Sequence, residues 1–212
     1  MSTLSAFATA QSVSTASEDR GTAILALLRP VFADKGFDGA SMQDLARAAG
    51  MSVGNFYRYF PSKAAIVAGM VGLDLHDIEQ DFAKIHTHPD PMLGLRQTIR
   101  DRVLEEDCVE DGKLWAEITA AALRKPEIGA AASQMEAVVS QHLTAVFARA
   151  TRRTPADAAQ RYGAHAALIV MLFKASAMRH NPTDPTSDAL TQLVLRTIER
   201  TLDDISADAV KG

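Results

Sequence analysis

Apolar residues recur at three- and four-residue intervals along most of the 212-residue chain, and this spacing is typical of amphipathic helices. Long helices are predicted over residues 18–35 and from residue 62 to about residue 86. Five more are predicted at about residues 92–107, 112–124, 126–151, 155–179 and 187–204. With two short helices between residues 41 and 60, these segments predict an all-α fold of about nine helices.

Capping residues and helix breakers delimit the two short helices. Ser41 and Asp44 have the spacing of a capping box, and Gly50 supplies a left-handed exit from the first short helix. Ser52 is the predicted N-cap of the second, which Pro61 must end by residue 60 because the residue before a proline avoids helical geometry. We therefore predict two helices that flank a tight turn.

The N-terminal segment combines a tail with a helix. Residues 1–17 are rich in Ser, Thr and Ala and contain no Lys or Arg, so they lack the positive segment that begins a secretory signal. We expect them to form a disordered tail. Gly36 is expected to end the helix that follows, and Pro30 is expected to kink it because proline removes a backbone hydrogen bond.

Cysteine content, hydropathy and charge limit the kinds of protein that this sequence can be. The single cysteine, Cys108, excludes an intramolecular disulfide framework and a multi-cysteine metal site, and it favours a reducing, cytoplasmic setting. The longest near-apolar stretch, residues 164–177, contains His165 and Lys174 and is too short to cross a bilayer. The net charge is −4, but residues 1–72 carry six Lys or Arg against five Asp or Glu, so only this third is suited to DNA.

Residues 36–63 carry the functional signal. Leu45, Ala46 and Ala49 are expected to face Phe60 and either Val53 or Phe56 across the turn, which fixes the crossing of the two helices. The opposite face of the second helix is then free to enter a major groove. Its outward residues are Val53, Gly54, Asn55 and Tyr57; an asparagine can pair with adenine, and hydroxyl and ammonium groups suit phosphate oxygens.

Three elements of this stretch resemble the DNA-binding domain of the tetracycline-repressor (TetR) family over about residues 18–66. They are Gly-Phe at 36–37, Ala-Ala-Gly at 48–50 and Phe-Tyr-x-Tyr-Phe-Pro-Ser-Lys at 56–63. The resemblance implies base contacts by Gln43, Val53, Gly54 and Asn55 and phosphate contacts by Ser41, Met42, Tyr57, Tyr59 and Lys63, and Ser52 completes the predicted DNA-binding set. Tyr57 and Tyr59 could instead cover the core, and we interpret Arg47 and Arg58 as solvated surface charges.

The same resemblance implies the rest of the molecule. It predicts a DNA-binding domain at residues 18–64 and an effector-binding and dimerisation domain at residues 65–212. A homodimer through helices 155–179 and 187–204 is expected, and the first of these helices is apolar on nearly every face. The predicted function is a repressor that a small-molecule effector releases from a pseudo-palindromic double-stranded DNA operator, with no cofactor and no catalytic residues.

The segment Leu114 to Ile118, with residues 124–127 after it, is similar to the choline- and betaine-linked branch of the family. This similarity implies a cationic or amphipathic effector, held by the π face of Trp115 and the charge of Glu117. The predicted effector pocket comprises Trp115, Glu117, His142, His165 and Met171. Core packing of Trp115 and both histidines, and a surface position for Glu117, are the open alternatives.

Other candidates are weaker. His86 and His88 could ligate a metal only if further ligands converged on them, and we predict no metal site. The acidic run at residues 105–111 is interpreted as a solvated surface, and Cys108 as a redox sensor is a minority reading. A small helical enzyme that uses acids and histidines of the C-terminal half, or a helical interaction module without DNA binding, remain the alternative functions.

Overall fold

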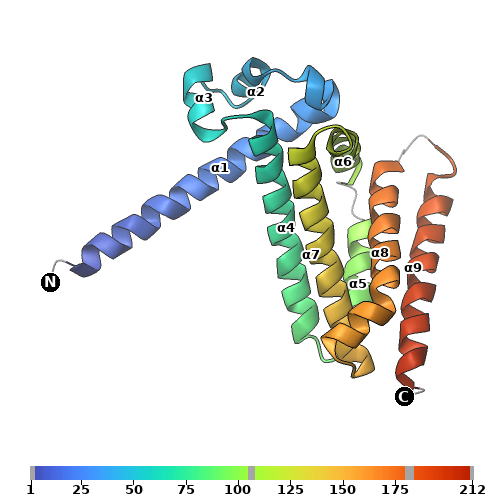
Figure 1. Ribbon diagram of the computed structural model, residues 1–212. Helices are drawn as coiled ribbons and strands as arrows, with labels where there is room; N and C mark the ends of the chain where they lie inside the picture. Colours follow the sequence, from blue (N-terminus) through green and yellow to red (C-terminus); the bar gives the residue numbers. More distant parts are fainter. Residues whose placement is uncertain (1–2, 105–107, 180–183, 211–212) are drawn as a thin grey trace.

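Nine helices make up the part of the chain that the computed structural model describes, namely residues 3–104, 108–179 and 184–210 (Figure 1). Their bounds are α1 (Thr3–Gly39), α2 (Met42–Ala48), α3 (Val53–Tyr59), α4 (Lys63–Thr87), α5 (Pro91–Leu104), α6 (Cys108–Ala122), α7 (Pro126–Thr151), α8 (Pro155–Arg179) and α9 (Ser187–Val210). The predicted all-α fold is confirmed. None of the described helices combines the length and apolar character needed to span a membrane.

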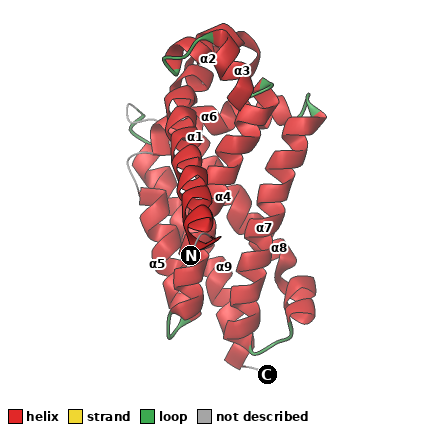
Figure 2. Cartoon of the chain, turned by 90° about the vertical axis from the view of Figure 1, so that its left-hand side faces the viewer, coloured by secondary structure: helices red, strands yellow, loops and turns green. Residues whose placement is uncertain are grey.

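The C-terminal part of α1 forms a head with α2 and α3 at one end of the molecule, and the N-terminal part of α1 projects away from it (Figure 1). Helices α5 to α9 form a helical body (Figure 2). Helix α4 starts in the head and runs along the body, where it contacts α5 and α7. The closest packing within the body joins α7 to α8, and α1 of the head packs against α6. The head is therefore attached to the body through α4 and α6.

Two clusters of buried side chains hold these parts together. The first unites the head with the start of α4 and with α6; its fully enclosed large members are Leu28, Phe32, Leu45, Phe56, Ile66, Met70, Leu114, Ile118 and Ile128. The second fills the body between α4, α5, α7, α8 and α9, around Phe147 and Ile198. Because the first cluster continues past residue 64, the predicted domain boundary there does not coincide with a gap in the core.

The predicted caps are confirmed. The Oγ of Ser41 accepts a hydrogen bond from the backbone N–H of Asp44, and the Asp44 carboxylate accepts one from the N–H of Ser41, which is a complete capping box. The hydroxyl groups of Ser52 and Ser62 cap α3 and α4, each by accepting a hydrogen bond from the backbone N–H three residues later. Gly50 has a left-handed φ of 65°, as expected for the residue that ends a helix.

The first helix differs from its prediction in where it begins, and agrees with it in the break at Gly36. It begins at Thr3, within the segment that we expected to be a disordered tail; this segment contains four alanines and neither glycine nor proline, so nothing in it breaks a helix. Its break falls at Gly36 (φ 70°, ψ 167°), which is its one residue with non-helical dihedral angles. Pro30 lies inside the helix, and the kink expected there stays a prediction.

Candidate nucleic-acid interface and effector cavity

Helix α3 is fixed by two aromatic side chains. Phe56 is 0% exposed and Phe60 is 8% exposed, and their ring centroids lie 5.5 Å apart. They pack with Leu45 and Ala46 of α2 in the first core cluster. Val53 is 36% exposed, so the inward residue of the two that the sequence allowed is Phe56. The opposite face of α3 consequently points to solvent.

Most of the predicted DNA-contacting residues gather on this exposed side of α2 and α3. The exposed members of the set are Ser41, Gln43, Ser52, Val53, Gly54, Asn55, Tyr57 and Tyr59. Tyr57 and Tyr59 are 47% and 36% exposed, which is against a role in covering the core. Met42 is half-buried against the core, and Ser41 and Ser52 serve as helix caps.

Gly54 has no structural reason to be a glycine. A Cβ built on it would meet no atom within 4 Å, and its backbone φ is not positive. Glycine inside a helix weakens that helix relative to alanine. The fold therefore leaves open space at this exposed position of α3, as it does at Gly72 of α4.

Lys63 makes contacts within the chain, and its expected phosphate contact stays a prediction. Its Nζ donates to the carbonyl oxygens of Phe37, Asp38 and Ala40 at 2.5, 3.2 and 2.9 Å, and it lies 4.8 Å from the centroid of the Phe37 ring. An ammonium group has three N–H donors, and these three carbonyls use all of them. In this structure Lys63 clamps the turn at residues 36–40.

The body holds the same turn from the other side. Glu117 of α6 accepts a hydrogen bond from the backbone N–H of Phe37 at 3.3 Å. Arg124 and Lys125 form ion pairs with Asp38 at 3.2 and 3.1 Å. Hydrogen bonds from Lys125 and then from Arg124 hold the pKa of the Asp38 carboxyl below its usual value. The turn at residues 36–40 is thus a joint between the head and α6.

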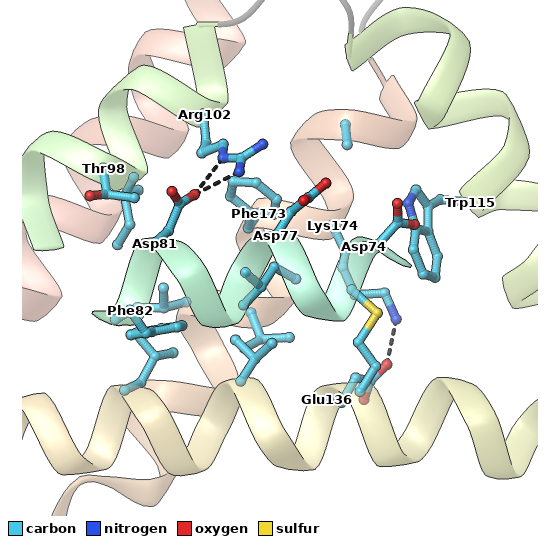
Figure 3. Close-up of a pocket in the computed structure, with 18 of the residues that line it drawn as sticks. Asp74, Asp77, Asp81, Phe82, Thr98, Arg102, Trp115, Glu136, Phe173 and Lys174 are labelled. Carbon is cyan, nitrogen blue, oxygen red and sulfur yellow. Dashed lines mark hydrogen bonds and ion pairs between the residues drawn. The ribbon is translucent and has the colours of Figure 1, made fainter. Parts of the chain in front are cut away.

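A cavity of about 310 Å³ lies in the body, between α4, α5, α6, α7 and α8. Its walls are largely apolar, and Figure 3 shows aromatic side chains from three different helices around it. The residues that line it are Asp74, Asp77, Ile78, Asp81, Phe82, Ile85, Leu95, Thr98, Ile99, Arg102, Trp115, Thr119, Ala132, Met135, Glu136, Val139, Leu143, Ile169, Val170, Phe173, Lys174 and Ala177. A concave, mostly apolar hollow with a few polar groups is the usual form of a small-molecule site.

Four carboxylates and two cations line this cavity. Arg102 donates two hydrogen bonds to Asp81 at 2.9 and 2.6 Å, and Lys174 pairs with Glu136 (Figure 3). Burial raises the pKa of Asp81, but the hydrogen bonds from Arg102 and Lys84 outweigh it, so that pKa lies below its usual value. The carboxylate is therefore ionised at neutral pH.

The remaining two acids lie on the same side of α4. Asp74 forms an ion pair of 3.0 Å with Arg29 of α1, which links the cavity wall to the head. Asp77 is exposed and has no ion-pair or hydrogen-bond partner among the described residues. The i, i+3, i+7 spacing of residues 74, 77 and 81 was visible in the sequence, but nothing there showed that a cavity lies against it.

Of the five predicted pocket residues, the structure brings only Trp115 to the cavity. Glu117 lies at the joint with Phe37, and His142 stacks on Phe82 with a centroid distance of 4.7 Å. His165 lies beside Tyr162, and Met171 is 60% exposed on the outer side of α8. Helical spacing predicted their helices but could not show which way each side chain points.

Three other sequence candidates can be placed only in part. The side chain of Cys108 and the acidic run at residues 105–111 lie outside the described residues. His86 approaches His142, with ring centroids 6.2 Å apart, and its pKa is lowered by burial and then by His142 and Arg149. Among the described residues no group of three or more potential metal-ligating side chains forms around the histidines or elsewhere.

Comparison with known proteins identifies the head. Residues 24–70 match the family model of bacterial regulatory proteins of the tetR family. The HTH-type transcriptional regulator EthR of Mycolicibacterium smegmatis is 34% identical over 84 residues, which are 39% of each chain. The HTH-type transcriptional regulator UidR of Escherichia coli strain K12 is 27% identical over 110 residues, which are 51% of this chain and 55% of that protein. The matches thus span less than two thirds of either relative.

Solved structures extend the likeness to the whole fold. Salmonella enterica GusR has a TM-score of 0.69 at 20% identity, covering 89% of this chain and 96% of its own. A putative TetR-family transcriptional regulator from Rhodococcus sp. has a TM-score of 0.68 at 18% identity, covering 88% of this chain and 99% of its own. The comparisons thus show a region of the tetR-family type at residues 24–70, and the fold of these solved structures over most of the chain. None of these relatives' names supports the choline- and betaine-linked branch.

The Lys63 clamp predicts that Lys63→Met destabilises the protein. Loss of its hydrogen bonds should lower the free energy of unfolding by about 1.5–3 kcal/mol, the worth of a hydrogen bond to a charged group. Urea denaturation at fixed protein concentration measures this. Tyr57→Phe is the matched control, because its exposed hydroxyl has no partner among the described residues and its loss should leave stability unchanged. Equal stability of Lys63→Met and the wild type would contradict the stabilising role of these hydrogen bonds.

Proposed function

We propose that the chain is a transcriptional repressor that binds a pseudo-palindromic DNA operator through α3 and is released by a small molecule bound in the body. The observation that carries this proposal is the exposed face of α3, where polar side chains flank a glycine that the fold does not need. Such a face matches the width of a major groove. A regulator of this kind works in the cytoplasm of a bacterial cell, on the chromosome.

A homodimer through α8 and α9 would present two such faces. Ala164, Ala167 and Met171 are exposed on α8 at helical spacing, and Leu190 and Leu193 are exposed on α9. Leu193 is 51% exposed and Met171 is 60% exposed, so both side chains offer apolar surface that a partner could bury. A two-fold dimer that buries this surface supports the expected symmetric operator.

Two contacts support communication between the cavity and the head. Asp74 on the cavity wall holds Arg29 of α1, and Trp115 on the same wall lies two residues before Glu117, which holds the turn after α1. A ligand that moves α4 or α6 therefore acts on α1 at two places. Such a ligand would shift the population away from the DNA-binding arrangement, and a tenfold shift needs about 1.4 kcal/mol of differential affinity.

The cavity favours an amphipathic effector with one cationic group. Arg102, Lys174 and Arg29 each pair with one of the four carboxylates. Asp77 is the one lining carboxylate without an ion pair among the described residues. The apolar walls and Trp115 would hold the rest of the molecule. This proposal rests on the cavity and not on similarity to a particular branch of the family.

DNA binding by α3 predicts that Gly54→Ala lowers the affinity for DNA without lowering the free energy of unfolding. The new methyl group enters open space, so the free energy of unfolding should stay the same or rise by up to about 1 kcal/mol. Affinity for DNA should fall by about tenfold or more, equivalent to at least 1.4 kcal/mol, because the backbone can no longer approach the groove.

Fluorescence anisotropy measures this with the intergenic duplex upstream of the chain's own gene and with a random duplex of equal length. Gly72→Ala is the control, since Gly72 is also open to solvent but lies on α4. Unchanged affinity of Gly54→Ala would contradict the role of α3. If the wild type itself shows no preference between the two duplexes at moderate ionic strength, the proposed function is wrong.

The dimer model predicts that the double variant Met171→Asp and Leu193→Asp is monomeric. Burying two carboxylates in each half of an apolar interface is strongly unfavourable, so the dissociation constant should rise by about a hundredfold or more. Sedimentation velocity measures the oligomeric state. Leu93→Asp is the control, because Leu93 is 45% exposed but lies on α5. A double variant that sediments like the wild type would exclude this interface.

The cavity predicts binding of a small organic cation. Because Trp115 is the single tryptophan, its fluorescence should change saturably on titration with hexyltrimethylammonium but not with hexanoate. Asp77→Asn should weaken the binding of the cation by about tenfold, or 1.4 kcal/mol, whereas Glu79→Gln, on the same helix but outside the cavity, should leave it unchanged. Binding of hexanoate as tight as that of the cation would rule out this effector class.

A further inference from the structure

Almost every basic side chain of the helix-turn-helix region is already engaged. Lys35 and Arg47 pair with Asp44 at 2.8 and 3.3 Å, and Lys63 clamps the turn at residues 36–40. Hydrogen bonds from Lys35 and then from Ser41 keep the pKa of Asp44 far below its usual value, so this acid stays ionised. Arg58 alone among the basic residues of α2 and α3 has neither an ion pair nor a hydrogen bond within the described part of the chain.

Arg58 also occupies the centre of the exposed face of α3. It lies two residues after Phe56 and two before Phe60, and two residues turn a helix by about 200°, so its side chain points away from the core that both rings enter. Gly54 and Asn55 precede it by four and three residues and therefore share its face. Tyr57 and Tyr59 lie to either side of it.

We propose that Arg58 reads a guanine in each half of the operator. Its guanidinium would donate two hydrogen bonds to the O6 and N7 atoms of that base, the most common specific contact in the major groove. The side residues Tyr57 and Tyr59 face the groove walls, where the phosphates lie, whereas the central Arg58 faces the base edges. Its neighbour Gly54 adds no bulk, so the helix can come close enough for the contact. The inference depends on the proposed DNA binding.

Sequence selection from a library of random duplexes tests the proposal with the full-length wild type, Arg58→Ala and Arg58→Gln. The wild type should select a sequence with a guanine at one position of each half-site. Arg58→Ala should lose that preference and bind the selected duplex about tenfold to a hundredfold more weakly. Arg58→Gln should shift the preference at that position toward adenine, because glutamine pairs with N6 and N7 of adenine.

Arg47→Ala is the matched control, because Arg47 is an exposed arginine of α2 that is already paired with Asp44. It should keep the wild-type preference even if overall affinity falls. Selection of the wild-type sequence by Arg58→Ala or Arg58→Gln, with unchanged melting temperature, would overturn the proposal. A wild type that enriches no sequence would instead overturn the proposed function, and this inference with it.

Discussion

The turn at residues 36–40 is the constraint on which the arrangement of the molecule depends. Gly36 adopts a left-handed φ of 70°, and a Cβ there would lie 2.8 Å from the Oε2 of Glu117, so both its conformation and its surroundings require glycine. The turn sends the chain from α1 into α2, and Lys63 and Glu117 hold it from opposite sides. The orientation of the head on α6 is set here.

The turn at residues 36–40 connects the exposed face of α3 with the distant cavity in the body. The cavity is lined by α4 and α6, and these two helices also supply the Lys63 and Glu117 contacts to the turn. The ion pair between Asp74 and Arg29 adds a third connection, to α1 itself. In the proposed mechanism the effector acts on α4 and α6 directly and on the DNA-binding face only through them.

The sequence predicted features that depend on neighbouring residues. The capping box at Ser41 and Asp44, the exit at Gly50 and the end of α3 before Pro61 are set within a few residues, and the structure has all of them. The starts of α7 and α8 at Pro126 and Pro155 were predicted for the same reason. The resemblance of residues 18–66 to a known family could be recognised because these local signals follow one another over many residues and form a specific pattern.

Features that depend on distant contacts could not be predicted. The contacts of Lys63 with the turn at residues 36–40 gave no local signal, because its carbonyl acceptors lie 23 to 26 residues earlier in the chain. The cavity needs side chains from five helices, so Asp77 and Phe173 gave no local signal, and Met171 was assigned to the wrong side of α8. Arg58 resembled any surface arginine until the ion pairs of Lys35 and Arg47 were known.

The central claim is that the exposed face of α3 reads DNA. The structure of the full-length chain bound to its selected duplex tests it most directly. The account predicts a two-fold dimer with each α3 in a major groove, the backbone at Gly54 close to the base edges and Arg58 against a guanine. A complex in which α3 faces solvent, with DNA held by another surface, would contradict it.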